Sequence, residues 1–130
     1  MLDRYSVTCT LPASDMERAK RFYDEKLGLT PAAEDPDGYV YDVGEGTRFT
    51  LFPSAGTPSG THTQIAWRVD DVAKVVEELR SRGVEFEKLD MPGFDPSTMI
   101  AQLGDGRGAW FKDSEGNLHG IVQLPEDSPL

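Results

Sequence analysis

The chain has 130 residues, of which 38% are hydrophobic and 28% are charged, and its formal net charge is −10. This length and composition predict one folded domain and exclude a disordered chain. The excess of acidic residues repels phosphate backbones, so nucleic acid is not expected as a partner.

The sequence also argues against a membrane-spanning or secreted chain. No apolar run approaches the about 20 residues that a membrane helix needs. The first ten residues, MLDRYSVTCT, lack the basic region and apolar stretch of a secretory signal. The single cysteine, Cys9, has no partner for an internal disulfide, as is typical of a reducing compartment. We therefore expect a cytoplasmic protein with no membrane partner, whose acidic surface serves solubility or attracts a basic small molecule.

The first segment of the chain predicts a strand followed by a helix. Val7, Cys9 and Leu11 alternate with polar residues, which predicts a strand with one face packed on a helix and a polar opposite face. Cys9 is therefore expected to be a buried, unreactive thiol. Ser14 and Glu17 have the spacing of a helical capping box, and the amphipathic pattern that follows ends at Gly28.

The same order of elements occurs twice along the chain. After the first helix, segments 39–43 and 48–52 predict a hairpin that turns at 44–46, and 30–34 predicts a further strand. Asp15 matches Asp71 in the second half, with about fourteen extra residues placed at 91–106. The second half then predicts a strand at 64–69, a helix from Asp70 or Asp71 to Gly83, strands at 85–89 and 98–103, and a hairpin of 109–112 with 118–124.

This organisation predicts an α+β fold of two βαβββ modules, because helices are expected on one face of each sheet. The single domain, residues 1–130, divides into a first module at about 5–53, a linker at 54–61 and a second module at about 62–124. The polar strand faces are expected to line a cleft between the modules.

Three motifs carry a resemblance to a known family. They are residues 15–29 with Phe22-Tyr23 and Leu27-Gly28-Leu29, residues 65–71, and residues 110–117, which read WFKDSEGN. With these motifs the chain resembles the vicinal oxygen chelate superfamily, which has the glyoxalase/bleomycin resistance/dioxygenase fold. The resemblance implies a curved, incomplete barrel with the helices on its outer face, a ligand on the concave side, and a homodimer.

The resemblance also implies four positions at which enzymes of the family hold a divalent metal. In this chain they are Thr8, Thr50, Gln64 and Gly120. Glycine has no side-chain donor and neutral hydroxyls are poor ligands, so we expect no metal and no other cofactor. The alternative is a displaced metal site of His62, Gln64 and His119, which requires a register slip of one residue at His119.

The remaining polar and aromatic residues of the concave side are candidates for ligand binding. Arginine fixes anionic groups but also forms surface ion pairs, and aromatic rings bind planar ligands but also pack in cores. The candidates are Thr8, Thr10, Arg48, Thr50, Phe52, His62, Gln64, Arg68 and Trp110.

We therefore predict a glyoxalase/bleomycin-resistance-like protein that binds a small molecule in the cleft between its modules without metal. The alternative is a metal-dependent lyase, isomerase or dioxygenase of the same superfamily. The sequence identifies no catalytic residue and leaves open whether a reaction is catalysed.

Overall fold

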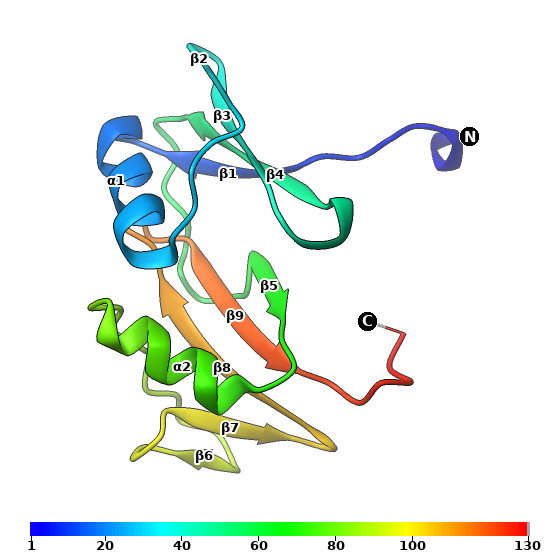
Figure 1. Cartoon of the computed structure of the whole chain (residues 1–130), viewed down its shortest axis with the longest axis vertical. Helices are drawn as coiled ribbons and strands as arrows, with labels where there is room; N and C mark the ends of the chain where they lie inside the picture. The colour runs from blue at the N-terminus through cyan, green and yellow to red at the C-terminus, as the bar shows by residue number, and fades with distance from the viewer. Residues whose placement is uncertain (130) are drawn as a thin grey trace.

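The computed structural model describes residues 1–129 as two modules, each with one long helix packed on one sheet (Figure 1). In the first sheet the strand order is β1-β4-β3-β2, with β1 parallel to β4 and the other neighbours antiparallel. Its elements are η1 (Leu2–Arg4), β1 (Cys9–Ala13), α1 (Met16–Leu27), β2 (Ala33–Asp35), β3 (Gly38–Asp42), η2 (Gly44–Gly46) and β4 (Arg48–Pro53).

The second sheet has the order β5-β9-β8-β7-β6, with β5 parallel to β9 and the other neighbours antiparallel. Its elements are β5 (Ile65–Arg68), α2 (Val72–Ser81), β6 (Phe94–Asp95), β7 (Ile100–Leu103), β8 (Gly106–Lys112) and β9 (Leu118–Gln123). The two sheets are separate and do not close into a barrel, which confirms the predicted α+β class. Neither helix of the described residues combines the length and apolar character needed to cross a bilayer.

Both helices have defined ends. The Asp15 carboxylate accepts a hydrogen bond from the Arg18 N–H at 3.0 Å, and Asp71 does the same for Lys74 at 3.2 Å. The predicted capping box at Ser14 is therefore wrong, since Asp15 is the N-cap of α1. Gly28 ends α1 with φ 68°, a left-handed conformation that glycine adopts without steric cost.

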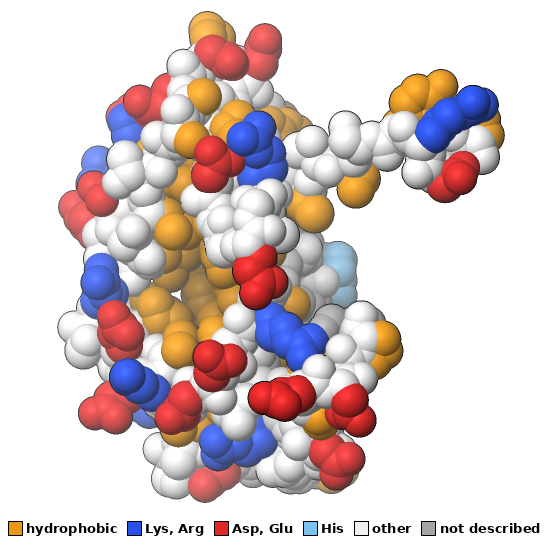
Figure 2. Space-filling view, turned by 45° about the vertical axis from the view of Figure 1, so that its right-hand side comes forward, with side chains coloured by type: hydrophobic (Ala, Val, Ile, Leu, Met, Phe, Trp, Pro, Cys, Tyr) orange, Lys and Arg blue, Asp and Glu red, His pale blue; other side chains and the backbone are white. Residues whose placement is uncertain are grey.

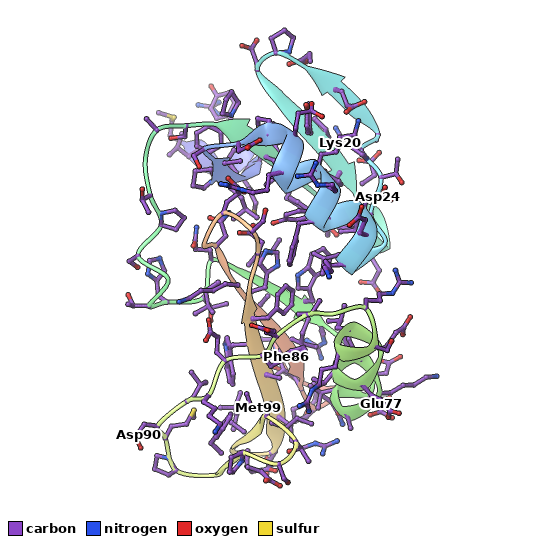
Figure 3. All side chains as sticks on the ribbon, turned by 90° about the vertical axis from the view of Figure 1, so that its left-hand side faces the viewer. Lys20, Asp24, Glu77, Phe86, Asp90 and Met99 are labelled. Atoms are coloured by element: carbon purple, nitrogen blue, oxygen red, sulfur yellow. The ribbon has the colours of Figure 1, made fainter. Side chains whose placement is uncertain are left out.

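The helices bury the apolar stripes that the sequence predicts, in two adjoining cores. Ala19 and Tyr23 of α1 and Val72 and Val76 of α2 are buried. Phe22, Leu27 and Trp67 pack against both cores and so join the modules. In Figure 3, Phe86 and Met99 lie beside the second sheet, whereas Lys20, Asp24 and Glu77 lie on the outer surfaces of the helices.

One predicted strand does not form and another is shorter than expected. Residues 85–89 make only an isolated bridge, Phe86 with Phe111, although Val84 and Phe86 alternate into the core as strand residues do. The extra segment of the second module instead contributes β6 and β7. The first strand begins only at Cys9.

Residues 1–8 extend away from the body of the protein and are fully on the surface (Figures 1 and 2). Cys9, at the start of β1, is also exposed, so its expected burial is wrong. It shares a strand face with Leu11 and Ala13, which are buried, but α1 lies over the opposite end of β1 (Figure 1). Alternation identified the face, whereas the position of the helix decided which residues on that face are covered.

Candidate functional site

The candidate residues of the first sheet lie on the face turned away from α1. Thr10 pairs with Thr50, and Thr50 pairs with Val40, so the three side chains form a row across the sheet. The other face carries Tyr41 and Phe49, which are buried in the core. Thr10 is exposed and Thr50 is half-buried.

The remaining candidates of the first module lie around this row. Phe52 is half-buried and pairs with Pro12, and Thr8 lies in the exposed segment before β1. Arg48 forms a 2.8 Å ion pair with Asp42, with both side chains more than half exposed. Of the two roles expected for Arg48, a ligand contact or a surface ion pair, the structure shows the ion pair.

In the second module, the candidate face is centred on Trp110. Gly120 pairs with Ala66 on one side and with Trp110 on the other. The Trp110 indole N–H donates to the Thr63 hydroxyl at 3.0 Å, which fixes the half-buried ring. Arg68 shares this face of β5 and donates to the Pro125 carbonyl at 2.9 Å. The structure thus gathers an aromatic surface, small residues and a guanidinium group on one sheet face.

The positions at which the resemblance implies a metal do not fit one in this structure. A Cβ atom built on Gly120 would lie 3.2 Å from the Trp110 Nε1 atom and 3.3 Å from the Thr63 Cγ2 atom, so an indole covers the place of a ligand side chain. The Gln64 amide donates to the Asn117 Oδ1 atom at 3.0 Å, and its oxygen accepts from the Leu118 N–H at 3.3 Å. Among residues 1–129 no group of three or more His, Cys, Asp or Glu side chains is placed to hold a metal ion.

The displaced site with His62 and His119 is not assembled either. His119 pairs with Ile65 and Phe111 without a register slip, and its ring is fully buried. The Trp67 N–H can only donate, so the His119 Nδ1 atom at 3.0 Å must accept and the Nε2 atom must carry the proton. The His119 Nε2–H group therefore donates to the Tyr23 hydroxyl oxygen, at 3.0 Å between the heavy atoms. His62 is exposed in the linker, and its Nδ1 atom is hydrogen-bonded to the Ser59 hydroxyl at 3.2 Å.

A buried polar network between the modules is the main feature that the sequence did not predict. Its centre is Asp113, at the turn between β8 and β9, which accepts a hydrogen bond from the Tyr23 hydroxyl at 2.6 Å. The Asn117 amide donates to the same carboxylate at 2.9 Å, as do the backbone N–H groups of Glu115 and Asn117. Burial raises the pKa of Asp113, but the nearby His119 ring and the hydrogen bonds from Tyr23 and Asn117 outweigh it, and the pKa is lowered.

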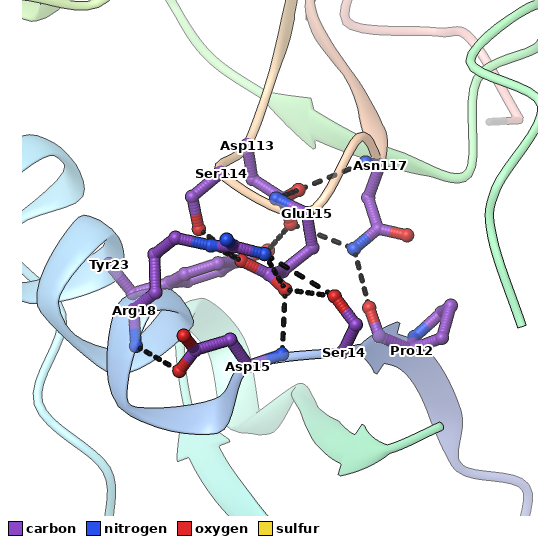
Figure 4. A network of polar contacts seen from close by, with 9 residues as sticks. All are labelled: Pro12, Ser14, Asp15, Arg18, Tyr23, Asp113, Ser114, Glu115 and Asn117. Atoms are coloured by element: carbon purple, nitrogen blue, oxygen red, sulfur yellow. Dashed lines mark hydrogen bonds and ion pairs between the residues drawn. The ribbon is translucent and has the colours of Figure 1, made fainter. Parts of the chain in front are cut away.

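Glu115, in the same turn, forms a second link to the first module (Figure 4). Its carboxylate accepts from Arg18 at 2.8 and 3.0 Å and from the Asp15 N–H at 3.0 Å, and only 1% of its side chain is exposed. Burial raises the pKa of Glu115, but the hydrogen bonds, above all that from Arg18, lower it to about 2. The Asn117 amide also donates to the Pro12 carbonyl at 3.0 Å. The Phe22-Tyr23 and DSEGN motifs were the sequence signal for this network, but they do not show that the two motifs meet.

Comparison with known proteins supports the resemblance. The family model of the Glyoxalase/Bleomycin resistance protein/Dioxygenase superfamily matches residues 6–120. The uncharacterized protein YetH of Bacillus subtilis (strain 168) is 29% identical over an alignment of 119 residues that covers 85% of this chain and 91% of YetH.

Solved structures agree. TnmS3, an antibiotic binding protein from Streptomyces sp. CB03234, matches with a TM-score of 0.64 and 28% identity over 94% of this chain and 98% of its own. A bleomycin-binding protein complexed with bleomycin matches with a TM-score of 0.66 and 20% identity over 92% and 98%. The chain belongs to the Glyoxalase/Bleomycin resistance protein/Dioxygenase superfamily.

Proposed function

We propose that this protein binds a small, planar organic molecule on the open face of its second sheet, without a metal ion. The observation that carries the proposal is the Trp110 indole over Gly120, because an aromatic surface stands where the family places a metal ligand. Aromatic faces bind planar ligands through dispersion and burial of apolar area. Two structural relatives are named for binding an antibiotic or bleomycin, which supports the same class of function here.

The charge of the protein favours a basic ligand. With 23 acidic and 13 basic residues, the protein attracts cations and repels anions over most of its surface. The Thr10–Thr50 row offers hydrogen-bonding groups on the open face of the first sheet. We place the action of the protein in the cytoplasm, where an exposed free thiol such as Cys9 stays reduced.

The test uses the two tryptophans, which lie on opposite faces of the second sheet. In a Trp67→Phe variant, Trp110 is the sole reporter, and we expect bleomycin or 9-aminoacridine to change its fluorescence in a saturable way. Treating the protein with a chelator beforehand leaves the affinity unchanged, whereas Trp110→Ala weakens binding about tenfold through loss of the stacking surface. The proposal fails if neither compound affects Trp110, or if protein purified without chelator carries a divalent ion at one equivalent.

We further propose that the protein works as a homodimer. β1 and β5 are edge strands, and the sheets are not closed, so both leave unpaired backbone groups that a second chain can cover. The exposed large hydrophobic side chains of the described residues all lie in the first seven, with Val7 92% and Leu2 75% exposed. Such a run of apolar surface is typical of an interaction segment.

Sedimentation equilibrium is expected to show a dimer at micromolar concentration. The triple variant Leu2→Ser, Tyr5→Ser, Val7→Ser should raise the dissociation constant by more than about tenfold, since burial of each such side chain contributes about 1.5–3 kcal/mol. The matched control replaces exposed polar residues of the same segment, Asp3→Ser and Ser6→Thr, and should leave the constant unchanged. A monomer at this concentration would contradict the dimer.

A further inference from the structure

An apolar cavity lies between the two modules, away from the Trp110 face. Its volume is about 170 Å³, and all its lining residues are hydrophobic. They include Leu27 and Leu29 of the first module and Trp67, Val75, Leu79 and Ile121 of the second. Figure 2 shows hydrophobic side chains within a depression between the two halves of the molecule.

The side chains of the cavity wall offer a ligand almost only carbon surface. The Trp67 indole N–H is already donated to His119 at 3.0 Å, so the ring offers the cavity only its carbon surface. A dry apolar cavity of about 150 Å³ is known to accept benzene. The volume therefore suits one six-membered ring.

Two cations cross between the C-terminal ends of the helices, and one of them, Arg82, lies at the wall of the cavity. A Cβ atom built on Gly28, which lies between Leu27 and Leu29 of the cavity wall, would be 3.3 Å from the Arg82 Nη1 atom. The Lys26 ammonium lies next to Gly83, where a built Cβ atom would be 2.5 Å from Nζ. Each side chain thus crosses to the C-terminal end of the opposite helix, where the helix dipole favours positive charge.

Lys26 and Arg82 are not held by carboxylates of the protein. Arg18, Lys20 and Arg48 each form an ion pair with a carboxylate. In the described part of the chain, neither Lys26 nor Arg82 has a side-chain ion pair or hydrogen bond, although the protein has 23 acidic residues. Their N–H donors therefore stay available to an anion at the edge of an apolar cavity.

We infer that this cavity binds a small aromatic carboxylate, with its ring between the modules and its carboxylate at Arg82 and Lys26. The ring fills the volume enclosed by Leu29, Trp67 and Val75, and the anion meets the two free cations. This site is separate from the open face of the second sheet, and it selects the opposite ligand charge.

The test uses 3-phenylpropionate and its uncharged amide, 3-phenylpropionamide. In a Trp110→Phe variant, Trp67 is the sole reporter, and its fluorescence should change in a saturable way. The amide should bind about two- to fivefold more weakly, as expected for a solvent-exposed ion pair. The Lys26→Gln, Arg82→Gln double variant should bind the two compounds equally.

A cavity-filling variant and a reversed reporter decide the location. Val75→Phe places a ring in the cavity and should weaken both compounds about tenfold or more. In the Trp67→Phe variant the remaining Trp110 should not respond. If Val75→Phe does not fold, the indole N–H resonances of the wild-type protein locate the site by NMR. On addition of 3-phenylpropionate only the Trp67 resonance should shift. No response of Trp67, or a response confined to Trp110, overturns the inference. The proposed binding at Trp110 is tested separately, with bleomycin and 9-aminoacridine.

Discussion

Asp113→Ala should lower the free energy of unfolding by about 3–5 kcal/mol. The Asp113 carboxylate accepts hydrogen bonds from the Tyr23 hydroxyl, the Asn117 amide and two backbone N–H groups. Tyr23, Asp113 and Asn117 are buried, so water does not replace the carboxylate as a hydrogen-bond acceptor. Its removal leaves several buried donors unpaired, and each costs about 1–3 kcal/mol. Urea unfolding followed by circular dichroism at neutral pH measures the change.

Two tyrosines provide a matched control for this network. Tyr23→Phe removes the hydroxyl that joins Asp113 to His119 and should cost about 1–3 kcal/mol. Tyr41 is equally buried, but its hydroxyl has no hydrogen-bond partner among residues 1–129, so Tyr41→Phe should be neutral or stabilising. Equal changes from the two substitutions would show that the hydrogen bonds of the Tyr23 hydroxyl to Asp113 and His119 add no stability.

Glu115→Gln should cost about 2 kcal/mol at neutral pH and progressively less in acid. The pKa of Glu115 is about 2 in the folded protein, below its ordinary value of 4.5, because Arg18 and neighbouring donors stabilise the charged form. A depressed folded pKa contributes stability that is fully present above about 4.5 and is lost as the pH falls toward about 2. Stability curves of wild type and Glu115→Gln should therefore converge in acid.

The measurement is urea unfolding from neutral pH down to about 3, for wild type and variant in parallel. Glu34→Gln is the control, because Glu34 forms an ion pair with Lys20 in which both side chains are well exposed. Solvent screens such a pair, so this variant should follow the wild type across the whole range. A gap between wild type and Glu115→Gln that does not narrow in acid would show that charge at Glu115 is not what couples the modules.

Through these two carboxylates the DSEGN motif has a structural role, since it connects the second module to α1 of the first. Asp113 and Glu115 lie two residues apart in one turn and hold different parts of α1, one through Tyr23 and the other through Arg18. The turn fixes how the first module sits against the second. The open sheet faces and the apolar cavity depend on that placement.

The sequence by itself determined the elements that depend on local pattern. Alternation identifies the hairpin of β3 with β4, and amphipathic spacing identifies both helical stripes, because side-chain direction repeats with a fixed period. Asp71 and Gly28 mark helix ends through their own capping chemistry. Residue chemistry alone showed that Gly120 offers no metal donor. The absence of a side chain holds in any fold.

Only the tertiary structure decided which faces are covered and which distant residues meet. Tyr39 and Tyr41 share one face of β3, but it was packing that buried Tyr41 and left Cys9 of β1 exposed. Arg18 and Glu115 are 97 residues apart, and a local period contains no information about a contact at that separation. The strand register places the Trp110 ring over Gly120. The docking of the two modules places Arg82 beside the apolar cavity.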